Sequence, residues 1–391
     1  MSAGIIAQDA SSKINTPATL AMLGGGQLGR FFVSAAHELG YKVIVVDPQE
    51  GCPAGLIADE HIVVDYDDAE ALEYLSSNCV AATTEFENVP AKTLDILAEH
   101  IPVHPSATAV AVAQDRVIEK SFLRDNGFTT APFVVLENES DFENVNEDLF
   151  PAILKIARLG YDGKGQARVK TIEEAKIAFQ EFNTPCVIEK MVALDLEVSV
   201  VMARNSEGVT ECFTLAENIH TNGILDISIV PARTSDALLA KAKSVASEVA
   251  RKLRYVGVLA VEFFISNGEL LVNEVAPRPH NSGHFTIDGC VTSQYEQQVR
   301  ALCGLQLGSS ASHSSTVMVN LLGDLWFQSG DESVEPDWAV LTNVPNLKVH
   351  LYGKASARIG RKMGHFVVVD KNPDVALKVA MDARKSIGIK D

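Results

Sequence analysis

The sequence has few positive charges for its size. Its 33 Lys and Arg residues are outnumbered by 51 Asp and Glu residues, which gives a formal net charge of −18 over 391 residues. Nucleic-acid binding draws on clustered Lys and Arg, and anionic membranes attract the same residues. We therefore expect neither a nucleic acid nor a membrane as a partner. A local basic site for a small anionic substrate is still compatible with an acidic whole.

Cysteine is also scarce and scattered. The six cysteines form no CxxC pair and no short regular spacing, which is typical of reduced cysteines rather than of disulfides or a zinc site. The N-terminal segment lacks the basic stretch and apolar core of a secretory signal. No uninterrupted apolar run approaches the roughly 20 residues of a membrane span. We expect a cytoplasmic protein whose first sixteen residues are loosely ordered.

What the sequence does contain is the composition of a globular protein, with 47% hydrophobic and 21% charged residues. Its length suffices for two or three domains. From residue 18 the order strand, glycine turn, helix, strand predicts a βαβ unit that opens a doubly wound sheet, and one helix is expected over 106–126. Shorter strands with a helix over 172–182 predict a small α+β module. A longer β-rich region and a closing helix over 373–387 complete the chain.

A glycine-rich loop follows the first predicted strand. Gly24, Gly26 and Gly29 fit the G-x-G-x-x-G pattern before a helix. Asp47 ends the second strand near the spacing of a ribose-binding acid. These residues alone favour an NAD(P)-dependent dehydrogenase no more than a tight turn on which helix and strand pack. The loop also offers backbone N–H groups at a helix N-terminus, where a substrate phosphate would satisfy the same physics.

A second glycine-rich segment lies further along the chain. Lys155 ends an apolar strand, and the segment 160–166 (GYDGKGQ) follows with three glycines around Lys164. Such a turn can close over a polyphosphate and give it N–H donors and a cation, with Lys155 as a fixed charge. The spacing is not that of a Walker A loop. An ordinary hairpin turn is the alternative for this segment taken alone.

Two glutamates interrupt apolar strands near residue 270. Glu262 lies within an apolar run, and Glu274 follows the next one. A hairpin with a three-residue loop over 267–269 would set the two carboxylates opposite each other. Like charges opposed across a ladder destabilise a sheet, and a divalent cation would remove the conflict. Oxygen ligands on a rigid hairpin suit Mg²⁺, whereas a different register would carry both glutamates to solvent.

Together these features resemble the ATP-grasp superfamily and, within it, the N5-carboxyaminoimidazole ribonucleotide synthetase family, whose members carry out an ATP- and bicarbonate-dependent carboxylation in purine biosynthesis. The motifs that carry the resemblance span residues 18–391 and are GGGQLGR (24–30), EFENVP (85–90), HPS (104–106), QDR (114–116), GYDGKGQ (160–166), ENIHTNGIL (217–225), NEVAPRPHNSGH (273–284) and LYGKASARIGRKMGH (351–365). The last motif, together with EFENVP, points to this family in particular, whereas NE with GYDGKGQ alone identifies only the superfamily. One departure is ARLG at 157–160, where many members carry a further glycine.

The resemblance implies a fold and a set of residue roles. The implied fold class is α/β and α+β, an ATP-grasp architecture with a Rossmann-like N-terminal domain (17–115), a small lid domain (116–192) and a larger C-terminal domain (193–391) that ends in a small β-rich subdomain. The residues that match ATP-binding positions are Arg116, Lys155, Gly160, Tyr161, Asp162, Gly163, Lys164, Gly165, Gln166, Glu189, Lys190, Met191, Val192, Glu197, His220, Asn273 and Glu274. The residues that match the ribonucleotide pocket are Gln27, Leu28, Glu85, Asn88, Tyr161, Asp162, Lys354 and Arg361. Glu262 and Glu274 match the ligands of Mg²⁺.

The implied chemistry needs no nucleophilic side chain. Bicarbonate attacks the γ-phosphate of the co-substrate ATP, while Lys155 and Lys164 offset negative charge. Arg278, directly after a metal ligand, is the candidate for holding bicarbonate and carboxyphosphate. The exocyclic amine of aminoimidazole ribonucleotide then takes up the carboxyl group or released CO₂. The partners implied are these small molecules and a second copy of the chain in a homodimer.

Other hypotheses remain at this stage. A related ATP-grasp ligase, such as the formate-dependent formyltransferase of the same pathway, would share most motifs, and a regulatory protein could keep the pocket without turnover. Glu197, taken alone, reads as a solvent-facing strand residue. His280 and His284 have the spacing of a zinc pair, but they lie in a loop without an HExxH motif, so we expect no zinc there. We expect His104 and His365 to be packing or hydrogen-bonding residues rather than catalysts.

Overall fold

The N-terminal part forms a parallel sheet between helices. The computed structural model describes residues 13–160, 164–328, 330 and 332–389. The sheet has the order β3-β2-β1-β4, and all its pairs are parallel. Its strands are β1 (Thr19–Leu23), β2 (Lys42–Val46), β3 (Glu60–Ile62) and β4 (Ala81–Thr84). The apolar runs of β1 and β2 are buried on both faces, as the predicted doubly wound sheet requires. The helices here are α1 (Gln27–Glu38), α2 (Ala69–Asn78) and α3 (Ala91–Ala98).

The prediction of one helix over 106–126 is wrong, because the chain forms two helices there. They are α4 (Ala107–Gln114) and α5 (Arg116–Asp125), and Asp115 between them has extended backbone angles. The Asp115 carboxylate accepts a hydrogen bond from the N–H of Val117 and so caps α5. The N–H of Arg116 donates to the carbonyl of Ala157 instead of continuing α4. The break turns Arg116 toward the segment that precedes the glycine-rich turn.

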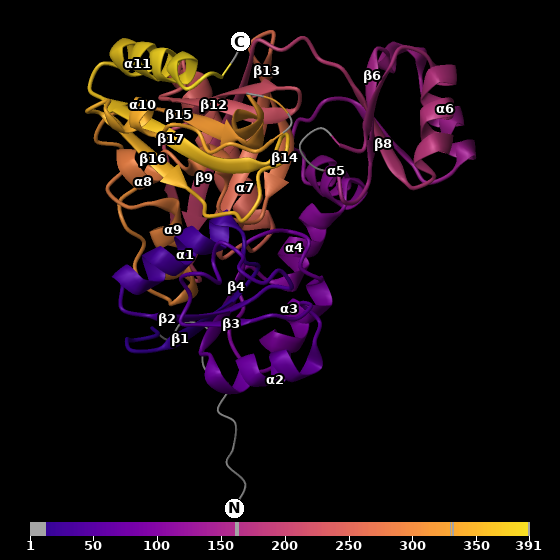
Figure 1. Cartoon of the computed structure of the whole chain (residues 1–391). Coiled ribbons are helices and arrows are strands. Elements are labelled where there is room, and N and C mark those ends of the chain that lie inside the picture. The colour runs from indigo at the N-terminus through magenta and orange to yellow at the C-terminus, as the bar shows by residue number, and fades with distance from the viewer. Residues whose placement is uncertain (1–12, 161–163, 329, 331, 390–391) are drawn as a thin grey trace, which may run out of the picture.

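A small module stands apart from the main body, at the upper right of Figure 1. Its antiparallel sheet has the order β5-β8-β6-β7. The strands are β5 (Phe133–Leu136), β6 (Ala152–Ile156), β7 (Gln166–Val169) and β8 (Cys186–Lys190). Helix α6 (Ile172–Phe182) packs on this sheet and closes its apolar core. The acidic stretch over 137–148, expected as a loop or a solvated helix, contains two short 3₁₀ helices, Glu139–Asn144 and Glu147–Leu149.

The largest sheet joins the central and C-terminal parts of the chain. It has nine strands in the order β14-β13-β9-β11-β12-β15-β17-β16, with β10 paired to β9. The strands are β9 (Leu196–Arg204), β10 (Thr210–Cys212), β11 (Ala216–Thr221), β12 (Ile224–Val230), β13 (Gly257–Ser266), β14 (Glu269–Ala276), β15 (Ser315–Leu322), β16 (Leu347–Leu351) and β17 (Lys362–Asp370). The C-terminal strands therefore extend the same sheet. The helices of this part are α7 (Asp236–Lys252), α8 (Thr286–Gly289), α9 (Gln294–Leu302), α10 (Ala339–Thr342) and α11 (Pro373–Ser386), together with short 3₁₀ turns at Asn281–Gly283 and Gly323–Phe327.

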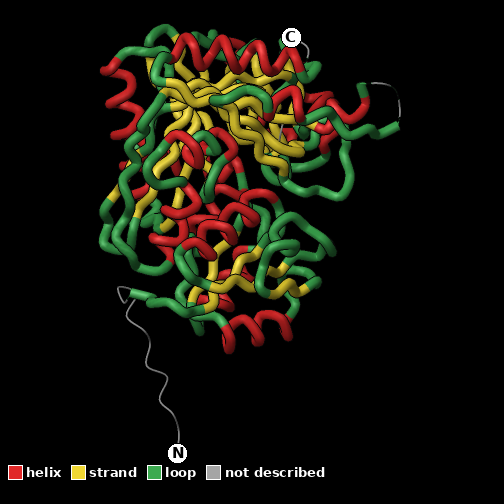
Figure 2. Tube along the Cα trace, turned by 60° about the vertical axis from the view of Figure 1, so that its left-hand side comes forward, coloured by secondary structure: helices red, strands yellow, loops and turns green. Residues whose placement is uncertain are grey.

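Helix α9 connects the two large sheets. It packs against α1 on one side and against β13 and β9 on the other. Figure 2 shows the parallel sheet below this helical layer and the nine-stranded sheet above it. In the part of the chain that the structure describes, no helix combines the length and the apolar character that crossing a bilayer would need.

The β13–β14 hairpin sets Glu262 directly opposite Glu274, but by a different route from the one expected. The turn has two residues, Asn267 and Gly268, both with positive φ, rather than three. That turn alone would offset the glutamates by one position. A bulge between Glu262 and Phe263 shifts the register, so that Phe263 pairs with Val272 and Glu262 with Glu274. The extra residue on β14 is Asn273.

Candidate active site

The opposed carboxylates on β13 and β14 have unlike protonation tendencies. Burial and the neighbouring charge of Glu274 raise the pKa of Glu262 to about 7. Burial also disfavours ionised Glu274, but the guanidinium of Arg116 outweighs it and holds the pKa of Glu274 at about 2. The side-chain oxygen of Asn273, between them in sequence, is buried and has no hydrogen-bond partner among the described residues. Two hard carboxylates and an unpaired carbonyl oxygen fit a site for Mg²⁺, with the other ligands coming from phosphate and water.

One buried carboxylate holds two lysines. Glu189, at the end of β8, lies 3.0 Å from Nζ of Lys120 and 3.1 Å from Nζ of Lys155. The Lys120 ammonium also donates to the carbonyl of Asn273 across 2.9 Å. Burial works against the ionised carboxylate, but the two lysines outweigh it and lower the pKa of Glu189 to about 2. The Glu189 side chain is therefore committed to the lysines, and Lys155 is fixed on a rigid strand as expected.

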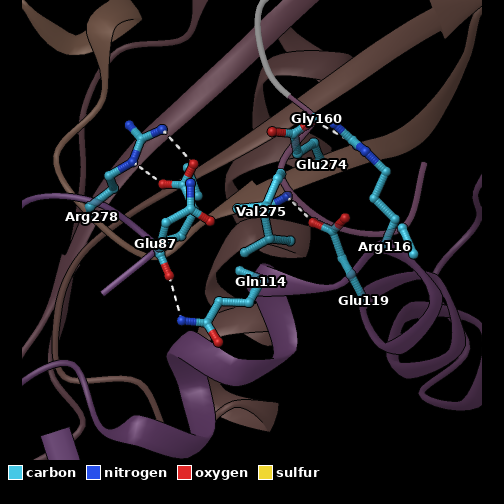
Figure 3. Close-up of a pocket in the computed structure, with 13 residues that line it drawn as sticks. Glu87, Gln114, Arg116, Glu119, Gly160, Glu274, Val275 and Arg278 are labelled. Atoms are coloured by element: carbon cyan, nitrogen blue, oxygen red, sulfur yellow. Dashed lines mark hydrogen bonds and ion pairs between the residues drawn. The ribbon is translucent and has the colours of Figure 1, made fainter. Parts of the chain in front are cut away.

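Helix α5 connects this lysine pair to the metal-site strand. Arg116 Nη1 donates to Glu274 Oε2 across 3.1 Å, and Glu119 Oε1 accepts the backbone N–H of Val275 across 2.6 Å (Figure 3). Burial and the charge of Glu274 raise the pKa of Glu119 to about 8. Three side chains of one helix thus converge on the segment 273–275, and they hold β14 against the small module.

Arg278 extends from the loop after β14 toward the N-terminal part of the chain. Its guanidinium forms an ion pair with Glu87, which lies in the loop after β4. Gln114 supports the same loop, because its side-chain amide donates to the carbonyls of Glu87 and Val89 across 2.6 and 2.7 Å. Arg278, Glu87, Gln114 and Glu274 line one pocket, which Gly160 of the glycine-rich turn also borders (Figure 3).

Two histidines lie on the other side of the carboxylate pair. His220 Nδ1 is 2.7 Å from Glu197 Oε2. Burial lowers the pKa of His220, but the contact with Glu197 and the charges of Glu262 and Glu197 together outweigh burial and raise it. Glu197 is therefore paired rather than solvent-facing. His280 Nε2 is 3.1 Å from Glu262 Oε1, while its Nδ1 contacts Ser282 Oγ at 2.8 Å. Burial and the charge of Arg278 lower the pKa of His280 well below its usual range, so the ring beside Glu262 is neutral.

The N–H groups of the first glycine loop bind carboxylates of the chain itself. Glu85 accepts from the N–H groups of Gly26 and Gly29 across 2.7 and 2.6 Å. Asp47 accepts from the N–H of Gly25 across 2.7 Å. The N–H groups of Gly25, Gly26 and Gly29 are therefore engaged by acids of the chain itself, and a substrate phosphate at this loop stays a prediction for the remaining N–H groups of the helix N-terminus. Asp47 fixes the loop instead of offering itself to a ribose.

Of the other expected ribonucleotide residues, Gln27 and Leu28 follow this loop directly and Lys354 lies near Glu85. Gln27 and the buried Leu28 begin α1, and Asn88 is exposed after Glu85. Lys354 Nζ donates to the carbonyl of Lys362 across 2.6 Å, and its charge reaches Glu85. Arg361 donates to the carbonyl of Ser356 and so stabilises the C-terminal loop between β16 and β17, which also carries Lys354. The C-terminal loop and the first glycine loop thus meet, although they lie more than three hundred residues apart.

The glycine-rich turn is described only at its edges. Tyr161, Asp162 and Gly163 lie outside the described residues. Lys164 is exposed, Gly165 has a φ of +70°, and Gln166 begins β7. A Cβ at Gly165 would lie 2.3 Å from the side chain of Ile156, so this position requires glycine for space as well as for backbone angle. Lys190, Met191 and Val192 end β8 and begin the connection to β9.

Sequence reasoning missed several residues that the structure brings into the site. They are Glu87, Glu119, Lys120 and, as a partner of Glu262 rather than of zinc, His280. Lys120 could have been found, because it follows Arg116 by one helical turn and must share its face. Glu87 carried no such signal, since its partner Arg278 lies 191 residues away in sequence.

Comparisons with known proteins match this arrangement over nearly the whole chain. Residues 18–114 match the family described as the ribonucleotide synthetase preATP-grasp domain, residues 121–295 the ATP-grasp domain, and residues 316–378 the phosphoribosylaminoimidazole carboxylase C-terminal domain. The N5-carboxyaminoimidazole ribonucleotide synthase of Brucella melitensis is 44% identical over 359 residues, which are 89% of this chain and 95% of the relative. The synthase of Bacillus subtilis is 41% identical over 363 residues, which are 91% and 93% of the two chains.

This chain belongs to the N5-carboxyaminoimidazole ribonucleotide synthase family. The resemblance found in its sequence motifs is therefore confirmed, and family membership argues against a dehydrogenase built on the first glycine loop.

Solved structures of synthase family members have the same architecture. An ADP complex of one N5-carboxyaminoimidazole ribonucleotide synthetase superposes with a TM-score of 0.88 at 39% identity, over 95% of this chain and 97% of that one. A synthase from Aspergillus clavatus, in complex with ADP and 5-aminoimidazole ribonucleotide, superposes with a TM-score of 0.84 at 27% identity, over 95% and 98%. The ATP-grasp fold class that the motifs implied is confirmed.

Proposed function

We propose that this chain is an ATP-dependent ligase that carboxylates 5-aminoimidazole ribonucleotide to N5-carboxyaminoimidazole ribonucleotide, with bicarbonate as the carbon source and ADP and phosphate as by-products. The observation that carries the proposal is one pocket lined by Arg116, Glu274 and Arg278. Glu262 lies opposite Glu274 across the ladder, and the charge of Lys155 helps to lower the pKa of Glu274. A family member crystallised with ADP and the same ribonucleotide supports the choice of substrate. The formyltransferase alternative lacks this support, since the curated relatives described above are synthases.

The site residues fall into groups according to the substrate that each would bind. Lys155 and Lys164 would offset the phosphates of ATP, with Arg116, Lys120, Glu189 and the connection after β8 shaping the nucleotide site. Arg278 would hold bicarbonate and then carboxyphosphate in the pocket beside Glu274. Glu85, Asn88, Gln27 and Leu28, with Lys354 and Arg361 opposite, would bind the ribonucleotide. Tyr161, Asp162 and Gly163, which lie outside the described residues, are proposed to contact ATP as well.

The chemistry balances without a side-chain nucleophile. An oxygen of bicarbonate attacks the γ-phosphorus and forms carboxyphosphate, and the bond to the β-phosphate oxygen breaks to release ADP. The exocyclic amine of the ribonucleotide then forms a bond to the carboxyl carbon, directly or through released CO₂, and phosphate leaves. Carboxyphosphate hydrolyses in water, so closure of the turn over 160–166 would protect it.

Glu262, Glu274 and the side-chain oxygen of Asn273 would hold Mg²⁺, which supplies charge stabilisation to the ATP phosphates when bound. His280 Nε2, which lies 3.1 Å from Glu262 Oε1, would help to orient this carboxylate.

Release of phosphate in an ATPase assay tests the proposal. We expect turnover that requires both bicarbonate and 5-aminoimidazole ribonucleotide, in buffer freed of dissolved CO₂ before bicarbonate is added back. Formate should not replace bicarbonate. Turnover with formate and a glycinamide ribonucleotide would overturn the assignment, and binding of ATP without any turnover would point to a regulatory protein.

Three further properties follow from family membership rather than from the described contacts. We propose that the chain acts in the cytoplasm as a homodimer, and that its domains divide near residues 115 and 192. The first division is supported by the family models, one of which ends at 114 and the next of which begins at 121. Sedimentation of the purified protein tests the dimer directly, because a monomer at working concentrations would contradict it.

A further inference from the structure

An ion pair between Glu87 and Arg278 connects the two loops that the proposed reaction must bring together. Arg278 Nε donates to Glu87 Oε2 across 2.5 Å, and Nη2 lies 3.5 Å from Glu87 Oε1. Figure 3 shows the carboxylate facing this edge of the guanidinium. The two side chains are 27% and 18% exposed, so solvent screens the pair only in part.

The pair leaves part of the guanidinium available. Arginine has five N–H donors in one plane. Glu87 engages the edge formed by Nε and Nη2, and Nη1 donates to the carbonyl of Pro279 across 3.2 Å. Among the described residues, nothing accepts the remaining N–H group on each terminal nitrogen. A planar anion with two free oxygens, such as bicarbonate, can accept hydrogen bonds from two such donors at once, which fixes its orientation.

Glu87 is itself held firmly. Gln114 donates from one nitrogen to the carbonyls of Glu87 and Val89, on either side of Asn88. Burial would protonate Glu87, but the guanidinium of Arg278 outweighs it and lowers the pKa of Glu87, so the pair stays ionised. Arg278 comes from a loop with no such clamp on its own side chain apart from the contact with Pro279. Gln114 therefore fixes the loop that carries Glu87, and Glu87 in turn fixes the orientation of the Arg278 guanidinium.

We propose that Glu87 is a positioning residue: from the loop that carries Glu85 and Asn88, it fixes the plane of Arg278 so that the free N–H groups face the carboxyphosphate site beside Glu274. This inference rests on the proposed function. Its consequence is that the loop next to the ribonucleotide amine also sets the orientation of the group that holds the carboxyl donor. The segment 85–89 would thereby align the ribonucleotide amine with the carboxyl donor.

The test is Glu87→Gln, which keeps the shape and one acceptor but removes the charge. We expect the KM for bicarbonate to rise about tenfold, as a loss of ~1.4 kcal/mol of binding would give, with the KM for ATP within twofold of the wild type. Glu87→Asp keeps the carboxylate and should recover part of the bicarbonate affinity. A general loss of structure would instead raise both KM values and lower the melting temperature.

Glu217→Gln is the matched control. Glu217 pairs with Arg233 in the same two-pronged manner, with Nε to Oε2 at 2.9 Å, but in a different part of the molecule. This control should leave the KM for bicarbonate unchanged. A bicarbonate KM within twofold of the wild type in Glu87→Gln, or an equal rise for ATP, overturns the inference. If Glu87→Gln does not fold, the same comparison with Glu87→Asp decides. A wild-type enzyme without bicarbonate-dependent turnover would overturn the proposed function itself.

Discussion

Glu262 faces Glu274 across the β13–β14 ladder because the strands slip by one residue at the bulge between Glu262 and Phe263. The bulge places the two carboxylates on the same face and inserts Asn273 beside them. Such an arrangement is unfavourable without a cation, since opposed like charges destabilise a sheet. We infer that the bulge serves to bring these two carboxylates together at a cation site.

Removal of one of these charges should stop turnover without unfolding the protein. We expect Glu274→Gln to lower ATP-dependent phosphate release more than about 100-fold at ordinary Mg²⁺ concentration, because a ligand of the proposed metal is lost. Glu269→Gln, at the exposed start of the same strand, is the control and should keep full activity. Circular dichroism checks the fold of both variants. Unchanged turnover in Glu274→Gln would refute the metal site.

The carboxylate of Glu189 should be essential for stability because it is the shared partner of Lys120 and Lys155. Glu189→Gln would leave two buried ammonium groups without a counter-charge. Breaking a buried ion pair in this way costs about 3–5 kcal/mol in the free energy of unfolding. Chemical denaturation at pH 7 measures the loss, and Glu181→Gln, on the exposed side of α6, should change the free energy of unfolding very little.

The same residue predicts a pH dependence. The folded pKa of Glu189 is lowered from 4.5 to about 2, so its stabilising effect is fully present above pH 4.5. As the pH falls from 4.5 toward 2, the unfolded chain takes up a proton at this carboxylate before the folded protein does, and the stabilisation disappears as the pH falls through the folded pKa. The difference in unfolding free energy between the wild type and Glu189→Gln should therefore shrink over this range. A difference that stays constant down to pH 2 would contradict the ion-pair origin.

Local pattern was enough to predict some of these elements, and long-range contacts decided the rest. Helix α6 has the predicted bounds, because its apolar spacing and its Thr171 cap lie within the segment itself. The break at Asp115 was missed, since the continuing apolar pattern hid a residue that caps the second helix. The hairpin was predicted with the right pair of glutamates but the wrong turn, because one bulge compensated for one missing loop residue.

The site shows the same division. Motif residues such as Lys155 and Glu274 could be named from the sequence, because each carries an unusual charge in an apolar strand. Their partners could not, since Glu87 lies 191 residues from Arg278 and Glu85 lies 56 residues from Gly29. A buried carboxylate beside a helix N-terminus competes with any phosphate for the same N–H groups, and only the packed structure reveals that competition.

The contact between the Glu85 carboxylate and the first glycine loop should be disturbed by a single methyl group added at Gly29. A Cβ at Gly29 would lie 2.6 Å from the carbonyl oxygen of Gly24 and 3.2 Å from Glu85 Oε2. Overpacking of this kind costs about 1–3 kcal/mol, because the backbone has to shift. We expect Gly29→Ala to lower the melting temperature and to raise the KM for the ribonucleotide more than the KM for ATP. Steady-state kinetics with each substrate varied in turn measures both constants.

Gly268→Asn is the control for that substitution. Nothing lies within 4 Å of a Cβ at Gly268, and its φ of +75° is one that asparagine tolerates better than most residues. Its melting temperature and both KM values should stay close to those of the wild type. Equal effects of the two substitutions on the ribonucleotide KM would show that Glu85 is not specifically seated by Gly29.

Two stacked histidines should make the protein less stable in mild acid. The rings of His284 and His365 lie 4.4 Å apart and are fully buried, with Nδ1 of each bonded to a tyrosine hydroxyl. Burial and neighbouring histidines hold the pKa of both well below the usual value near 6.5. The unfolded chain therefore binds more protons than the folded one below pH 6.5, and the free energy of unfolding must fall as the pH falls.

His365→Asn tests this linkage, because asparagine can still accept the hydrogen bond from Tyr352 but cannot titrate. We expect the slope of unfolding free energy against pH, between pH 6.5 and 5, to decrease by up to about 1.4 kcal/mol per pH unit relative to the wild type, the value for one proton. His313→Asn, at an exposed histidine, should change that slope far less. Denaturant unfolding at a series of pH values measures the slopes, and parallel lines for the wild type and His365→Asn would mean that the buried ring takes up its proton without unfolding.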